Sequence, residues 1–212
     1  MKIVSLITAR GGSKGIPLKN IVDVNGKPLI WYSINASSNS KVSETWVSTD
    51  SEKIAILSKE YGAKSLNRPT HLADDIIMPD DSIVHFANCV DFDWVVFIQP
   101  TSPMIKSKYI DRGIEMIESG EYDSVFTATK EHWLPRWNKN VEPIDWDIYN
   151  RPRRQDKPEL YTENGMFYIT RRENLLTSKL RYSGKIGVVE IPLIDSFQVD
   201  TTEDLELIRK II

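Results

Sequence analysis

Near the start of the chain, a short apolar run leads directly into a loop rich in glycine and basic residues. Ile3 to Ile7 has the composition of a buried strand, and the loop after it reads Ala9-Arg-Gly-Gly-Ser-Lys-Gly-Ile-Pro-Leu-Lys-Asn20. Ligands of open α/β sheets bind where the strands end, so this loop is expected to face a ligand. Its glycines let the backbone approach a bulky group, and Arg10, Lys14 and Lys19 supply positive charge. This combination favours a polyphosphate.

A plainer interpretation is that Gly11-Gly12-Ser13 forms only a tight turn and that the lysines around it are solvated. The string Gly-x-x-x-x-Gly-Lys-Ser/Thr, whose lysine reaches the outer phosphates in a Walker loop, does not occur in the chain. A phosphate bound by this loop is therefore held in another way.

Apolar runs alternate with segments of helical spacing along most of the chain. Strands are expected at 3–7, 44–48, 94–98, 123–129, 166–169 and 186–191, and helices after Pro28, after Asp50, at 81–90, at 108–118 and after Thr201. Residues 63–79 are expected to form a loop. The alternation predicts an α/β fold with a doubly wound, mostly parallel sheet.

Size and charge limit the possible functions. At 212 residues with 41% hydrophobic content, the chain suits a single domain with its own core. The formal charge of −3 gives no basic excess of the kind that binds nucleic acid. The sequence shows neither a secretory leader nor a membrane span, so we expect a soluble cytoplasmic protein. The single cysteine, Cys89, excludes an internal disulfide and is expected to be buried in a helix.

The apolar run Trp94 to Ile98 is typical of a central buried strand and ends in Gln99-Pro-Thr-Ser-Pro103. Two prolines prevent the strand from continuing, so Gln99, Thr101 and Ser102 are expected at the carboxyl end of a core strand. Polar groups at such ends are positioned to bind ligands.

The first loop resembles the signature of the acylneuraminate cytidylyltransferase family, which makes CMP-activated nonulosonic acids such as CMP-sialic and CMP-legionaminic acid. Further strings carry the resemblance over most of the chain: Arg68-Pro-x-x-Leu-Ala, Gln99-Pro-Thr-Ser-Pro, and the Arg-Arg-Gln-x-x-Pro-x-x-Tyr-x-x-Asn-Gly pattern that 153–165 match closely. The resemblance implies a Rossmann-like nucleotidyltransferase fold. It also implies attack of an acidic nine-carbon sugar on the α-phosphate of CTP, which needs no covalent nucleophile.

The resemblance assigns roles to particular residues. Arg10, Lys19 and Asp200 are the implied catalytic residues. The implied nucleotide-binding residues are Arg10, Gly11, Gly12, Ser13, Lys14, Lys19, Asn20, Arg68 and Ser82. The implied acceptor-binding residues are Gln99, Thr101, Ser102, Arg154, Gln155, Tyr161, Asn164 and Phe167. From the sequence alone, Arg68 suits an ordinary solvated arginine and Ser82 a helix cap.

Asp200 occupies the position at which the family's aspartate binds Mg²⁺. Many members carry a second acid two positions earlier, where this chain has Gln198. A glutamine oxygen can bind a hard cation but supplies no charge, which leaves one or two metal ions open. The three histidines are too scattered to form a zinc site.

Residues 130–160 combine three tryptophans with several prolines and lack helical or strand periodicity. We expect an arm inserted in a single nucleotidyltransferase domain spanning 1–212, packed against a second subunit and contributing to that subunit's site, as the family's dimerisation segment does. The alternative is that the arm folds back on its own sheet.

Other acceptors stay open: an octulosonate, or a small phosphorylated or phosphonate acid. The related octulosonate enzymes would place an acidic residue near Gln99, and this chain has none there. A nucleotide-binding protein without turnover is a further alternative, because Gln198 replaces an acid.

Overall fold

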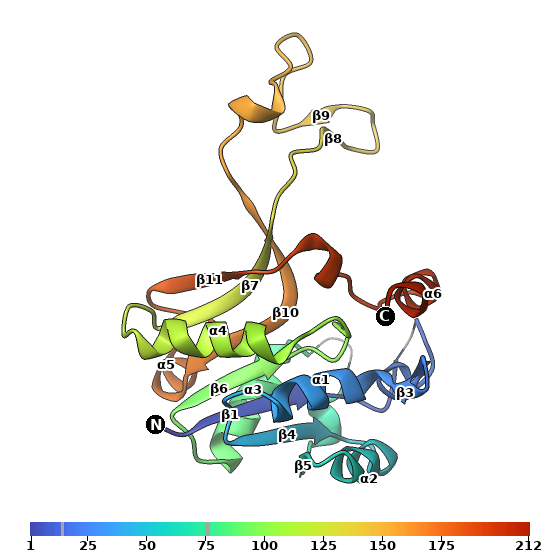
Figure 1. The fold of residues 1–212 in the computed structure, drawn as a ribbon, viewed down its shortest axis with the longest axis vertical. Coiled ribbons are helices and arrows are strands. Elements are labelled where there is room, and N and C mark those ends of the chain that lie inside the picture. The colour runs from blue at the N-terminus through green and yellow to red at the C-terminus, as the bar shows by residue number, and fades with distance from the viewer. Residues whose placement is uncertain (14, 75–76) are drawn as a thin grey trace.

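The computed structural model describes residues 1–13, 15–74 and 77–212. Within them a seven-stranded sheet has the order β11-β7-β10-β6-β1-β4-β5 (Figure 1). Its strands are β1 (Ile3–Thr8), β4 (Glu44–Thr49), β5 (Lys64–Asn67), β6 (Trp94–Ile98), β7 (Ser124–Lys130), β10 (Tyr161–Arg171) and β11 (Ile186–Glu190). Neighbouring strands are parallel except where β10 runs antiparallel to β6 and β7. The expected mostly parallel sheet is confirmed.

Helices cover both faces of the sheet. One core cluster joins the sheet to α1 (Leu29–Ser38), α2 (Glu52–Glu60) and α4 (Ser107–Glu118). A second cluster, on alternate residues of the same strands, joins it to α3 (Pro79–Cys89) and α5 (Arg172–Ser178). The last helix, α6 (Thr202–Ile211), packs near the small hairpin of β2 (Asp23–Val24) and β3 (Lys27–Pro28). The sheet is therefore doubly wound.

Local sequence signals place several element ends. Ser51 caps α2 by accepting a hydrogen bond from the backbone amide of Ile54. Thr201 and Asp204 form a capping box at α6. Asn25 and Gly26 both have positive φ, as the tight turn between β2 and β3 requires.

The structure corrects three expectations. Residues 63–79 contain an additional edge strand, β5, which pairs with β4 although it lacks a long apolar run. β10 begins at Tyr161 rather than at Met166, because residues 161–163 pair with β7 before a bulge shifts the register. Cys89 is exposed rather than buried, because it is the last residue of α3.

Residues between β7 and β10 project away from the body of the molecule (Figure 1). This projecting segment contains the two-stranded hairpin of β8 (Arg136–Trp137) and β9 (Pro143–Ile144). Trp137 and Trp146 meet edge to face at 5.0 Å, while Val141 and Tyr149 are exposed. The projecting segment does not fold back on the sheet of its own chain (Figure 1). In the part of the chain described here, no helix is both long enough and apolar enough to span a bilayer.

Candidate functional site

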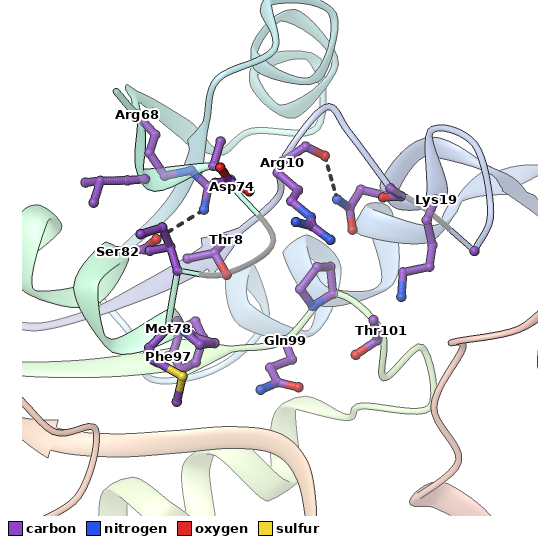
Figure 2. A pocket seen from close by; sticks show the side chains of 18 residues that line it. Thr8, Arg10, Lys19, Arg68, Asp74, Met78, Ser82, Phe97, Gln99 and Thr101 are labelled. Carbon is purple, nitrogen blue, oxygen red and sulfur yellow. Dashed lines mark hydrogen bonds between the residues drawn. The ribbon is translucent and has the colours of Figure 1, made fainter. Parts of the chain in front are cut away.

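The order of the strands creates a site at the carboxyl ends of β1 and β6. From β1 the chain moves outward through β4 and β5, then returns to β6 on the other side of β1. The loops after β1 and β6 therefore leave the sheet in opposite directions, and a crevice opens between them. A cavity of about 610 Å³ lies there. Thr8, Arg10, Lys19, Arg68, Ser82, Gln99 and Thr101 are among the residues that line it (Figure 2).

The first cavity has basic side chains on two opposite sides. Figure 2 shows Arg10 and Lys19 on the side of the glycine loop, opposite Arg68 and Ser82. The Asn20 side chain donates to the Arg10 carbonyl oxygen at 2.9 Å and so braces the loop. A Cβ on Gly15 would lie 3.0 Å from the backbone oxygen of Asp200, so this glycine lets the loop approach the segment before α6.

Asp50 connects the glycine loop to the opposite side of the cavity. Its carboxylate accepts from the Gly11 amide at 2.9 Å and lies 3.8 Å from Nη2 of Arg68. By sequence either Asp50 or Ser51 could cap the helix that follows, and in the structure Ser51 is the cap. Its place at the end of β4 was the available signal, since polar residues at strand ends gather at the same edge of a parallel sheet.

Arg68 is the most deeply buried cation in this cavity among the described residues, with 5% of its side chain exposed. Its Nη1 donates to Ser82 Oγ at 3.3 Å, while Nε and Nη2 have no hydrogen-bond partner among the described residues. Burial lowers the pKa of Arg68; the Asp50 carboxylate opposes this shift, and the nearby Arg10 adds to it. Buried unpaired donors are costly, so Arg68 is arranged to receive acceptor atoms of a ligand.

Lys19 and Asp200 join the two ends of the chain at the rim of the cavity. The Lys19 ammonium lies 2.9 Å from Asp200 Oδ1 across 181 positions of sequence. Asp200 is well exposed, so this ion pair contributes little to stability. The ion pair matters for the site because it holds a cation of the glycine loop beside an accessible carboxylate.

A second cavity, of about 1110 Å³, adjoins the first at Gln99, which lines both. Thr129, Glu131, Glu163, Asn164, Glu190 and Gln198 are among its other lining residues. The basic residues on its wall are already paired: Lys130 with Glu159 at 2.7 Å, and Arg136 with Asp145 at 2.9 Å. The side chains with which a single chain lines the second cavity are therefore predominantly acidic.

Gly165 lies where the two cavities meet. Its φ is +66°, and a Cβ there would lie 2.7 Å from Gln198 Nε2 and 3.1 Å from Gln99 Oε1.

Gly165→Ala is expected to destabilise the fold by about 1–2 kcal/mol through its left-handed backbone, and further by displacing both glutamines. Gly62→Ala is the matched control, because Gly62 has φ +87° and open space around it. Equal decreases in the free energy of unfolding of the two variants, measured in urea, would contradict this account.

The chain is similar to known proteins over nearly all of its length. The cytidylyltransferase family model matches residues 4–211. The chain belongs to the cytidylyltransferase family. N-acylneuraminate cytidylyltransferase A of Danio rerio is 37% identical over 96% of this chain and 49% of its own length. The pseudaminic acid cytidylyltransferase of Campylobacter jejuni subsp. jejuni serotype O:2 is 31% identical over 99% of this chain and 95% of its own. The chain spans about half the length of the N-acylneuraminate relatives that it matches.

Solved structures agree on the fold. A CMP-2-keto-3-deoxy-manno-octonic acid synthetase complexed with CTP superposes with a TM-score of 0.77 at 22% identity, covering 99% of this chain and 98% of that one. The 4-diphosphocytidyl-2C-methyl-D-erythritol synthase of Anaerococcus prevotii gives a TM-score of 0.71 at 14% identity, over 99% and 95%. The Rossmann-like nucleotidyltransferase fold expected from the sequence is thereby confirmed.

The two cavities together are lined by many of the site residues predicted from the sequence. Residues that line the first cavity are Arg10, Ser13, Lys19, Asn20, Arg68, Ser82, Gln99 and Thr101. Residues that line the second are Gln99, Asn164 and Asp200, while Tyr161 lies beside it, 3.4 Å from Glu190. Lys14 lies outside the described residues. The roles of all these side chains stay predictions.

Several predicted residues line neither cavity. Gly11 and Gly12 belong to the glycine loop but are not among the residues that line the first cavity. Ser102 and Phe167 are fully buried, and Phe167 belongs to the core of the sheet, so neither presents a side chain to an acceptor. Arg154 and Gln155 lie on the projecting segment, where Nη2 of Arg154 is 2.9 Å from His132 Nδ1.

The carboxylates near the glycine loop fit a magnesium ion that is shared with a nucleotide. Asp204 accepts from the amides of Asp200 and Thr201 in the cap of α6, whereas the Asp200 carboxylate is well exposed beside Lys19. The described residues contain no cluster of three or more acidic, histidine or cysteine ligands. Mg²⁺ is commonly held by one or two carboxylates together with substrate phosphates and water, and Asp200 beside a basic loop suits that arrangement.

Proposed function

We propose that this chain transfers a cytidylyl group from CTP to the anomeric hydroxyl of an acidic nine-carbon sugar, with release of pyrophosphate. The observation that carries this proposal is the meeting at Gln99 of two cavities: a first one with cationic walls, and a second large enough for a sugar. Relatives named for N-acylneuraminate and pseudaminic acid support an acceptor of the nonulosonic acid type.

In this mechanism the anomeric oxygen attacks the α-phosphorus of CTP, its proton departs, and the bond from that phosphorus to the pyrophosphate oxygen breaks. The protein must align the attacking and leaving oxygens and neutralise the charge that builds on the leaving group. Arg10, Ser13 and Lys19 line the first cavity, and in this proposal they bind the phosphates. Arg68, Ser82 and Asn20 are placed to orient the nucleoside, with the unpaired donors of Arg68 meeting its acceptor atoms.

Mg²⁺ would be held at Asp200, where it supplies charge neutralisation for the phosphate oxygens. The chain's own residues then have two tasks: Asp200 anchors the ion at the rim, and Lys19 exchanges its carboxylate partner for a phosphate oxygen. Gln99, which borders both cavities, is placed to orient the acceptor against the α-phosphate.

Among the described residues of one chain, the acidic side chains that line the second cavity outnumber the lysine and arginine side chains. An acidic sugar entering a wall of glutamates meets repulsion, because like charges disfavour a shared site. Arg151 and Arg154 belong to the segment that projects from the body of the molecule (Figure 1), and Nη2 of Arg154 lies 2.9 Å from Nδ1 of His132. We infer a homodimer in which segment 130–160 of one copy supplies an arginine to the acceptor cavity of the other. The exposed apolar side chains of the segment support this use.

Mixed dimers would test the contribution of the segment across the interface. Arg154→Ala and Lys19→Ala homodimers are each expected to be weakly active, whereas co-expressed mixed dimers regain one complete site. With random pairing, activity should recover to about a quarter of the parent value, since half of the dimers then hold one competent site of two. The unfractionated mixture of dimers is assayed for pyrophosphate release, and different tags on the two subunits verify that both are present in equal amounts. An arm that serves its own subunit would give no recovery.

A pyrophosphate-release assay with CTP, Mg²⁺ and a panel of acids tests the function itself. Sialic, legionaminic, pseudaminic and octulosonic acids, with a phosphonate acid, form the panel. Release with one of the three nonulosonic acids, and formation of the CMP-sugar, is the expected result. Release only with the octulosonic or the phosphonate acid would assign another acceptor. Binding of CTP without release for every acid would identify a protein that has lost turnover.

A further inference from the structure

Arg181 lies between the two cavities, in the segment that follows α5. Only 14% of its side chain is exposed. Its guanidinium carbon is 5.8 Å from the centre of the Phe97 ring and 5.0 Å from that of Tyr168. Phe97 lines the first cavity and Tyr168 lines the second. A single buried cation therefore contacts one aromatic wall of each cavity.

Asp80 holds this cation on the side of the first cavity. Its carboxylate accepts from Arg181 Nη2 at 2.5 Å and from the Arg181 backbone amide at 2.7 Å. Burial by itself would lower the pKa of Arg181, but the Asp80 carboxylate and Tyr168 together outweigh burial and the pKa is raised. Asp80 belongs to the first turn of α3, between Pro79 and Ser82, which line the first cavity.

Tyr168 extends the contact toward the second cavity. Its hydroxyl donates to Glu163 Oε1, and burial and this carboxylate together raise the pKa of Tyr168. Glu163 and Tyr168 stand at the two ends of the bulge of β10. The Asn164 carbonyl within the bulge accepts from Gln198 Nε2. The bulge thus lies against the glutamines at the junction of the cavities.

We propose that Arg181 is a positioning residue for the acceptor: bridging Asp80 and Tyr168, it keeps the Tyr168 hydroxyl on Glu163 and so fixes the β10 bulge beside Gln99 and Gln198. Phosphoryl transfer depends on the alignment of the attacking oxygen, so a loosened bulge weakens acceptor use. The same bridge joins the bulge to α3, so nucleotide binding and acceptor binding become coupled. This inference rests on the proposed function for its kinetic part.

Tyr168→Phe tests the bridge with little risk to folding, because it removes one hydroxyl and keeps the ring. We expect the acceptor KM to rise about tenfold, with kcat and the CTP KM within about twofold of the parent values. Hydrogen exchange of the backbone amides at 163–166 should accelerate, while exchange in β1 stays unchanged. Tyr182→Phe is the matched control, since the Tyr182 ring packs at a tilt against that of Tyr168, with the ring centres 5.9 Å apart, and Tyr182 lines neither cavity.

Two further variants probe the bridge from its other end. Asp80→Asn should also raise the acceptor KM. Because both substitutions loosen one network, the double variant with Tyr168→Phe should change the free energy derived from KM by less than the sum of the two single variants. Arg181→Lys keeps the charge but loses the planar fork, and should resemble Tyr168→Phe in its KM. A Tyr168→Phe variant with parental acceptor KM and parental exchange at 163–166 overturns the proposal. If the parent uses no acceptor, the proposed function fails, and the exchange measurement still decides whether the bulge is held by this bridge.

Discussion

Lys19→Ala is expected to lower kcat/KM for cytidylyl transfer by roughly 30- to 900-fold, equivalent to about 2–4 kcal/mol of transition-state stabilisation. Lys19 lines the first cavity, and its ammonium is held at the rim beside Asp200. A preorganised cation there stabilises charge that grows on the leaving pyrophosphate, whereas water would first have to reorient. Arg10→Ala should lose activity within the same range.

The measurement is the initial rate of pyrophosphate release over a range of CTP concentrations that extends well below KM, at saturating acceptor and Mg²⁺, because its initial slope gives kcat/KM for CTP. Saturating Mg²⁺ matters because removing Lys19 also removes the ion-pair partner of Asp200, which changes metal affinity separately from charge stabilisation. Lys53→Ala, an exposed lysine of α2, is the control for loss of a surface charge. Unchanged release in both Lys19→Ala and Arg10→Ala would remove the glycine loop from the site.

Asp200→Asn should raise the Mg²⁺ concentration for half-maximal activity at least about tenfold, because a neutral amide binds a hard cation much more weakly than a carboxylate. The nearest positions along the chain do not replace it, because position 198 is glutamine and the Asp204 carboxylate accepts hydrogen bonds in the cap of α6. The variant also leaves Lys19 without its carboxylate partner.

A Mg²⁺ titration of pyrophosphate release compares Asp200→Asn with the parent. Glu203→Gln is the control, since it removes an exposed carboxylate from the first turn of α6 without touching Asp200 or the cap. Binding of Mg²⁺–CTP measured by calorimetry gives a second readout that does not depend on turnover. Superimposable titrations of Asp200→Asn and the parent would exclude Asp200 as a metal ligand.

Sequence reasoning was most successful where the signal is local. The run at 94–98 and its two following prolines predicted a buried strand ending in polar residues, and Gln99 does border both cavities. It was less successful at β5, because an edge strand lacks the long apolar run of a buried one. Phe167 was assigned to the acceptor from the string around it, but strand alternation directs its side chain into the core.

The sequence by itself determined the alternation of strands and helices, the glycine loop after the first strand and the family of the chain, because these depend on residues close together along it. Only the tertiary structure decided that Lys19 meets Asp200, that Gln99 separates two cavities, and that Arg181 joins Asp80 to Tyr168. Such contacts depend on strand order and register, which bring together side chains as much as 181 positions apart. No local pattern of residues encodes that order.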